Sequence, residues 1–71
     1  MKHDQYVLPN DEKWVVVDDT GFENANFFKS MMDAIRYAHT FADRYHAEVI
    51  VYKYDSNVLG PPIYVKNPEH M

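Results

Sequence analysis

The sequence contains no cysteine, and Gly21 and Gly60 are its only glycines among 71 residues. The absence of cysteine excludes a disulfide scaffold, a thiolate zinc site and a cysteine nucleophile. Two isolated glycines do not make a glycine-rich phosphate-binding loop. The longest apolar run, residues 14–17, is far shorter than the roughly 20 residues of a membrane-spanning helix. No apolar signal segment follows Met1, so we expect a cytoplasmic protein without a membrane partner.

An excess of positive charge is also missing. The chain has 11 acidic and 7 basic residues, which gives a net charge of −4. Residues 1–23 contain six acids and two bases and carry all of this excess, since residues 24–71 contain five of each. Nucleic-acid binding depends on neutralising phosphates with a basic surface. The charge distribution therefore argues against a general nucleic-acid binder.

Apolar side chains are plentiful enough for a folded core. Hydrophobic residues make up 46% of the chain and aromatic residues 15%, which argues against disorder of the whole chain. The length allows one domain. We expect residues 1–71 to form a single domain with an ordered core at about 5–66 and a frayed polar tail at 67–71.

The clearest predicted element is an amphipathic helix over residues 30–46. Ser30 and Asp33 have the spacing of a capping box at its start. Apolar side chains then recur every three or four residues and form one stripe along the helix, made of Met31, Ile35, Ala38, Ala42 and Tyr45 and widened by Ala34 and Phe41. A helix this short is marginal in isolation, so the stripe predicts packing against another element.

The flanking segments favour strands. Two strands, 5–9 and 13–19, are expected to form a hairpin, after which Gly21 takes a positive φ. Residues 22–28 read as irregular, extended only near 26–28. After the helix come a strand at 47–54, a loop at 55–62 and a short strand at 62–66. The order hairpin, helix, hairpin predicts an α+β fold, with an antiparallel sheet of three to four strands and the helix on one face.

The helix start and the strand after it resemble a known family. Residues 28–35 read Phe-Lys-Ser-Met-Met-Asp-Ala-Ile and lead into Ala38, Ala42 and the Ala-Glu-Val-Ile-Val of residues 47–51. This is similar to the pattern Phe-x-Thr-x-x-Glu-Ala-Ile, spaced alanines and Ala-Glu-Leu-Val-Val of the small domain of unknown function numbered 2188 (DUF2188), the YdaT-like family.

The N-terminal half carries the resemblance further. Residues 7–9 and the pair Trp14 and Val16 are similar to the Val-Val-Pro and Trp-Ala-Val of that family, so the likeness covers about residues 5–55. The family tends to have Asp-Gly at the last turn, whereas residues 55–57 are Asp-Ser-Asn. The resemblance implies a fold and a bacterial or phage-associated setting; it brings no activity and no site residue.

One edge of the helix could hold a metal. His39, Asp43 and His46 follow at spacings of four and three residues, and two histidines beside a carboxylate can ligate zinc or nickel. A complete site needs a further ligand from another element, for which His3 and His70 are the candidates. The alternative is a solvated helix edge on which Asp43 pairs with a histidine. We predict no metal and no cofactor.

Residues for catalysis are scarce. Ser30 is best used as a helix cap and Ser56 as a turn residue. Two carboxylate pairs, residues 11–12 and 18–19, are sequence neighbours on turns, and nothing in the sequence sets them across a cleft as acid and base. We therefore expect a protein that is not an enzyme.

The strand pattern predicts an apolar outer sheet face. If Trp14, Val16, Val49 and Val51 face the helix, alternation turns five other side chains to the opposite face. These predicted partner-binding residues are Val15, Val17, Ile50, Tyr52 and Tyr54. An exposed apolar face of this kind indicates a protein partner or a homodimer. The alternatives are a register shifted by one residue, or a C-terminal loop that folds over this face.

Two other functions remain open. The sheet tyrosines could stack nucleic-acid bases with help from Lys53 and Lys66. The acidic turns could dock on a basic protein surface as an inhibitor would, through Asp11, Glu12, Asp18, Asp19 and Glu23. The reading that we favour is a small non-catalytic interaction or regulatory module that uses its outer sheet face.

Overall fold

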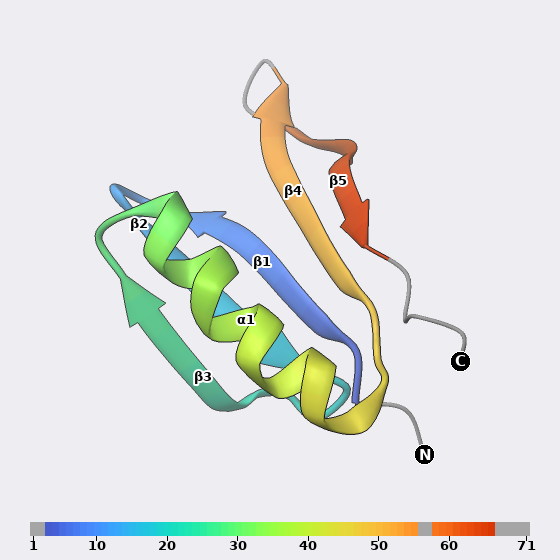
Figure 1. The fold of residues 1–71 in the computed structure, drawn as a ribbon. Coiled ribbons are helices and arrows are strands. Elements are labelled where there is room, and N and C mark those ends of the chain that lie inside the picture. Colours follow the sequence, from blue (N-terminus) through green and yellow to red (C-terminus); the bar gives the residue numbers. More distant parts are fainter. Residues whose placement is uncertain (1–2, 56–57, 67–71) are drawn as a thin grey trace.

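The computed structural model describes residues 3–55 and 58–66. It is an α+β fold with one helix and a five-stranded sheet (Figure 1). The elements in chain order are β1 (Gln5–Asn10), β2 (Lys13–Asp18), β3 (Gly21–Phe28), α1 (Met31–Tyr45), β4 (Val49–Asp55) and β5 (Val58–Lys66).

The sheet is mixed, which corrects the expected antiparallel sheet of three to four strands. The strand order is β3-β2-β1-β4-β5. β1 and β4 run parallel, whereas the other neighbouring pairs are antiparallel. Because α1 carries the chain back along the sheet, β4 enters beside β1 in the same direction. The two predicted hairpins are therefore joined side by side into one sheet.

β3 was expected to be largely irregular, and it is a strand of eight residues. It pairs with β2 through Trp14 opposite Phe28 and Val15 opposite Phe27, with a register shift between Val16 and Asp18. Aromatic and β-branched cross-strand pairs stabilise a sheet. They hold a segment whose asparagines have low strand propensity on their own.

β5 is longer than the predicted strand at 62–66 and takes in most of the segment that was expected to be a loop. Pro61 and Pro62 lie inside it, which an edge strand tolerates because no further strand needs their missing N–H groups. The register of β5 against β4 shifts at two places, between Val51 and Tyr52 and between Tyr52 and Tyr54.

The helix lies where the sequence predicts it. Ser30 is its N-cap, and the Ser30 hydroxyl oxygen accepts a hydrogen bond from the Met32 N–H at 3.2 Å. At the other end His46 is left-handed, with φ 53°. The backbone N–H groups of His46 and Ala47 both donate to the carbonyl of Ala42, which satisfies a carbonyl at the helix end.

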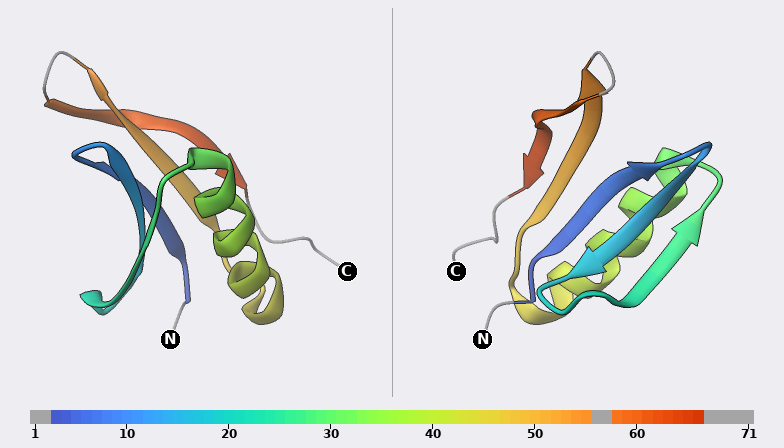
Figure 2. Two further views of the ribbon diagram at one scale, coloured as in Figure 1. Left: turned by 90° about the vertical axis from the view of Figure 1, so that its left-hand side faces the viewer. Right: turned by 180° about the vertical axis from the view of Figure 1, so that it is seen from behind.

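The core lies between α1 and one face of the sheet. Its buried side chains are Val7, Val16, Ala34, Ala38, Ala42, Val49 and Val51. Within the described residues no helix or strand covers the opposite face, which Figure 2 shows from behind. We call this opposite side of the sheet the outer face. The expected frayed tail at 67–71 lies outside the described residues.

Among the described residues no helix is long and apolar enough to cross a membrane.

Candidate interaction surface

The strand register places the five predicted partner-binding residues on the outer face. Trp14, Val16, Val49 and Val51 pack in or against the core on the helix side. Side chains alternate along a strand. The residues between and beyond them therefore point to the outer face: Val15, Val17, Ile50, Tyr52 and Tyr54. Residues 58–66 pair with β4 at the sheet edge, so they do not fold over this face.

Burial differs from the expectation that all five residues face water. Val15 is 0% exposed, Val17 6% and Ile50 9%. Larger neighbours on the same face flank all three: Val15 lies between Leu8 and Phe27, and Tyr6 lies between Val17 and Ile50. Of the five, Tyr52 is half-buried and Tyr54 is 51% exposed. The middle of the outer face is thus already packed, and its accessible apolar surface lies toward its sides.

The outer face contains further apolar residues that the sequence reasoning missed. Residues paired directly across strands share a face. Pairing with the predicted residues therefore adds Tyr6, Leu8, Phe27, Leu59, Pro62 and Val65. Side chains alternate along a strand, so the inward-facing Val7 would have placed its neighbours Tyr6 and Leu8 on the outer face. Leu59 was missed because residues 55–62 were expected to form a loop. Pro62 and Val65 lie in the strand predicted at 62–66, whose facing the sequence did not establish because its pairing with β4 was unknown.

A two-stranded arm extends the outer face beyond the core. We define the arm as residues 52–54 of β4 and 59–63 of β5. β4 pairs with β1 only from Val49 to Val51, so past that point the arm stands away from β1 (Figure 1). Among its side chains Tyr54, Leu59 and Ile63 are 44–53% exposed. An isolated two-stranded hairpin is at best marginally stable in water. The arm is therefore the part of the molecule that gains most from a covering surface.

Charge is scarce on the outer face. Among the cross-strand pairs that form it, the charged residue is Lys13, opposite Asn10 at the end of the β1–β2 hairpin. Burial raises the pKa of the Tyr6 hydroxyl, and the negative charges of Asp19 and Asp4 raise it further. Tyr6 is therefore neutral at physiological pH, and this face offers little to a charged ligand.

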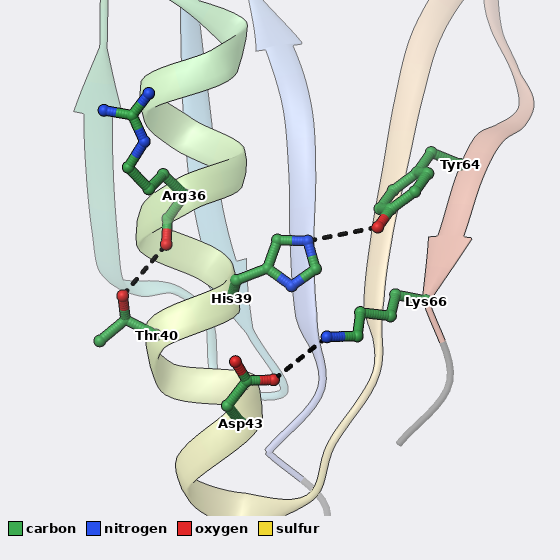
Figure 3. A network of polar contacts seen from close by, with 6 residues as sticks. All are labelled: Arg36, His39, Thr40, Asp43, Tyr64 and Lys66. Atoms are coloured by element: carbon green, nitrogen blue, oxygen red, sulfur yellow. Dashed lines mark hydrogen bonds and ion pairs between the residues drawn. The ribbon is translucent and has the colours of Figure 1, made fainter. Parts of the chain in front are cut away.

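The helix edge with His39 and Asp43 faces β5 (Figure 3). His39 Nε2 lies 3.3 Å from the Tyr64 hydroxyl oxygen, and Lys66 Nζ lies 3.5 Å from an Asp43 carboxylate oxygen. His46 is the left-handed cap at the helix end. His39 and Asp43 thus each contact a β5 side chain. Asp43 was predicted to pair with a histidine, but in the structure it pairs with Lys66. This exposed ion pair contributes about 1 kcal/mol or less.

No group of three or more potential metal-ligating side chains is found in residues 3–55 and 58–66. His3, one candidate for an additional ligand, stacks on Tyr45 at a centroid distance of 4.1 Å. His70, the other candidate, lies outside the described residues. Ser30 caps the helix as expected, and Ser56 is also outside the described residues.

The acidic side chains occupy opposite ends of β2. Asp11 and Glu12 form the turn between β1 and β2, whereas Asp18 and Asp19 lie at the other end of β2, where it turns into β3 (Figure 1). The carboxylates predicted for an inhibitor-like surface are therefore divided between two ends of the molecule.

Comparison with known proteins gives no relative: no family model, no curated protein and no solved structure matches the chain. Membership of the YdaT-like family therefore stays a prediction from the sequence pattern.

Proposed function

We propose that this protein is a small non-catalytic interaction module that pairs with a second copy of itself through the outer face. The observation that carries the proposal is the composition of that face. Eleven side chains on five neighbouring strands are apolar or aromatic, and the arm exposes several of them: Tyr6, Leu8, Val15, Val17, Phe27, Ile50, Tyr52, Tyr54, Leu59, Pro62 and Val65. Apolar patches of this kind mark interaction sites.

A second copy fits this face better than a charged partner does. A two-fold interface brings the same patch of each subunit together, so the patch must be complementary to itself. An apolar face without opposed charges meets that condition. The acidic turns at the ends of β2 lie outside the paired positions of the face but border it, since Asp11 and Glu12 adjoin Phe27 and the charge of Asp19 reaches Tyr6. A nucleic acid would instead need basic side chains on this face, and among the cross-strand pairs that form it Lys13 is the basic residue.

The contact is expected to join faces rather than sheet edges. One of the two edge strands, β5, carries Pro61 and Pro62. Proline has no N–H to donate, which hinders the addition of another strand at this edge. Face-to-face packing of two sheets instead buries side chains, as in a β-sandwich. In this proposal the module acts in the cytoplasm as a regulatory component, in keeping with the resemblance of residues 5–55 to a phage-associated family.

Sedimentation equilibrium tests the proposal. The wild type should show a mass approaching twice the 8.4 kDa of the chain as its concentration rises. Val65→Glu places a charge on the exposed part of the outer face and should weaken association at least about tenfold, because an unpaired charge is costly to bury. Met32→Glu is the matched control: Met32 is 58% exposed but lies on the helix, so this variant should dimerise like the wild type.

Val65→Glu is preferable to a substitution at Ile50, because Ile50 is buried within the single chain and its replacement by a charge would also disturb folding. A wild type that remains a monomer at millimolar concentration would contradict the proposal. So would equal weakening by Val65→Glu and Met32→Glu. Salt-dependent binding of single-stranded nucleic acid that Val65→Glu abolishes would favour the base-stacking function instead.

A further inference from the structure

A groove between α1 and β3 lies on the helix side of the sheet, away from the outer face. It has a volume of about 430 Å³. Its wall combines one carboxylate, three amide side chains and two aromatic rings, supplied by Asp18, Gln5, Asn24, Asn26, Tyr37 and Phe41. None of the residues described as lining it is basic. This lining differs from the apolar outer face and calls for a different ligand.

The carboxylate of the groove is held in place. The backbone N–H of Thr20 donates to Asp18 Oδ1 at 2.9 Å, and the Thr20 hydroxyl donates to the same oxygen. These hydrogen bonds lower the pKa of Asp18 below its usual value. Asp18 therefore carries a negative charge throughout the neutral pH range, and its side chain is half-buried at the groove.

The amide nitrogens of the groove residues are engaged in hydrogen bonds within the chain. Asn24 Nδ2 donates to the Thr20 hydroxyl at 3.3 Å, Asn26 Nδ2 to the Asn24 carbonyl at 3.1 Å, and Gln5 Nε2 to the His3 carbonyl at 2.8 Å. The nitrogen end of each amide thus has a protein acceptor. The oxygen ends receive no hydrogen bond from the described residues, and an amide oxygen can only accept. A ligand with several N–H donors would satisfy them.

The aromatic rings suit a cation. Tyr37 and Phe41 lie side by side with ring centroids 4.9 Å apart. The guanidinium carbon of Arg44 already lies 5.8 Å from the centroid of Phe41, which is within the range of a cation–π contact. The electron-rich rings beside an ionised carboxylate favour a flat positive group.

We propose that this groove binds a guanidinium group, either of free arginine or of an arginine side chain in a peptide. A guanidinium carries five N–H donors in one plane. It can pair with the Asp18 carboxylate, donate to amide oxygens and lie against Tyr37, since Arg44 already occupies the cation position over Phe41. The proposal does not depend on the dimer, because the outer face is on the other side of the sheet.

A titration followed by amide chemical shifts tests this site. The probes are free L-arginine and the peptide Gly-Arg-Gly, each compared with its citrulline counterpart, which keeps the shape but lacks the charge. The wild type should show shifts at residues 18–26 and at Tyr37 and Phe41 with both arginine probes, and much weaker shifts with citrulline. Tighter binding of the peptide would identify a protein arginine as the source, and equal binding would identify the free group.

Two matched variants test whether the charge of Asp18, and not that of a neighbouring aspartate, binds arginine. Asp18→Asn keeps an oxygen for Thr20 but removes the negative charge, and should weaken arginine binding about fivefold, the upper range for a partly exposed ion pair. Asp19→Asn removes the same charge from an exposed neighbour that does not line the groove, and should bind like the wild type. Equal binding of arginine and citrulline by the wild type would overturn the proposal, as would equal effects of the two substitutions.

Discussion

At the scale of single residues, His46 adopts a backbone conformation that is unfavourable for a residue with a β-carbon. It ends the helix in the left-handed region at φ 53°, where a β-carbon is strained by about 1 kcal/mol. Its side chain is exposed, so little packing offsets that cost. The helix end is nevertheless closed by two hydrogen bonds to the carbonyl of Ala42.

His46→Gly should therefore raise the free energy of unfolding by about 0.5–1 kcal/mol, because glycine takes this conformation without strain. Urea unfolding measures the change. His46→Ala removes the same imidazole and keeps the β-carbon, so it should give no comparable gain. Equal stabilities of the glycine and alanine variants would show that the backbone conformation of residue 46 is not the cause.

Local chemistry explains which single residues could be predicted. Gly21 has the expected positive φ of 73°. Asp11 also has a positive φ, which the turn pattern did not specify because aspartate tolerates that region without requiring it. The burial of Val15, Val17 and Ile50 could not be predicted either, since it depends on neighbours that come from other strands.

At the scale of elements, the helix rests on small side chains. Ala34, Ala38 and Ala42 follow every four residues and are 0–1% exposed. They let α1 approach the valines of β1, β2 and β4 closely. The predicted stripe includes all three alanines, and the spacing of the pattern was sufficient to place the helix because a helical face depends on local sequence alone.

Ala38→Leu should lower the free energy of unfolding by about 1–3 kcal/mol, because a larger side chain has no room between α1 and the sheet. Thermal or urea unfolding followed by circular dichroism measures this effect. Arg36→Leu makes the same new side chain on the exposed side of the helix and should change stability by less than about 0.5 kcal/mol. A fully tolerated Ala38→Leu would mean that the helix does not pack as described.

The arm is the element with the weakest support inside one chain. In the monomeric Val65→Glu variant, the amides of Tyr54 and Leu59 should exchange with solvent faster than those of Val7 and Val51, since the latter strands are held in the core. In the wild type at high concentration the arm amides should become protected. Exchange measured by NMR decides this. Equal protection of arm and core in the monomeric variant would show that the arm needs no partner.

Strands were harder to predict than the helix for a physical reason. The pattern of β2 and β4 is rich in β-branched residues, and both were placed to within a few residues. β3 and most of β5 contain asparagine, glycine and proline, which disfavour strands when they are read locally. Pairing with β2 and β4 overrides that preference, and such pairing is invisible in a local reading of the sequence.

At the scale of the whole molecule, the parallel pairing of β1 and β4 defines the topology. It is held at its start by the Gln5 N–H, which donates to the Glu48 carbonyl at 2.9 Å, and by the buried Asp4 carboxylate, which accepts from the Glu48 N–H at 2.9 Å. These contacts join residues more than forty positions apart. No local pattern specifies them, which is why two separate hairpins could be predicted but not the mixed sheet that they share.

The same arrangement leaves one layer of the fold open. A single helix of 15 residues packs against β1–β4 on one face of the five-stranded sheet. The apolar surface of the outer face must be shielded from water by its own side chains or by another molecule. Its large apolar residues shield Val15, Val17 and Ile50, but Phe27, Tyr54, Leu59 and Val65 remain 44–54% exposed at its sides. Pairing of two copies would cover these residues at both sides.

The most direct test is an isotope-filtered NMR experiment on a mixture of labelled and unlabelled protein, which detects contacts between chains only. We predict intermolecular contacts from the Val65 methyl groups and the rings of Phe27 and Tyr54, and none from Met32 on the exposed side of the helix. A concentrated sample that shows no intermolecular contact at the outer face, or shows contacts centred on the helix, would contradict the proposed dimer.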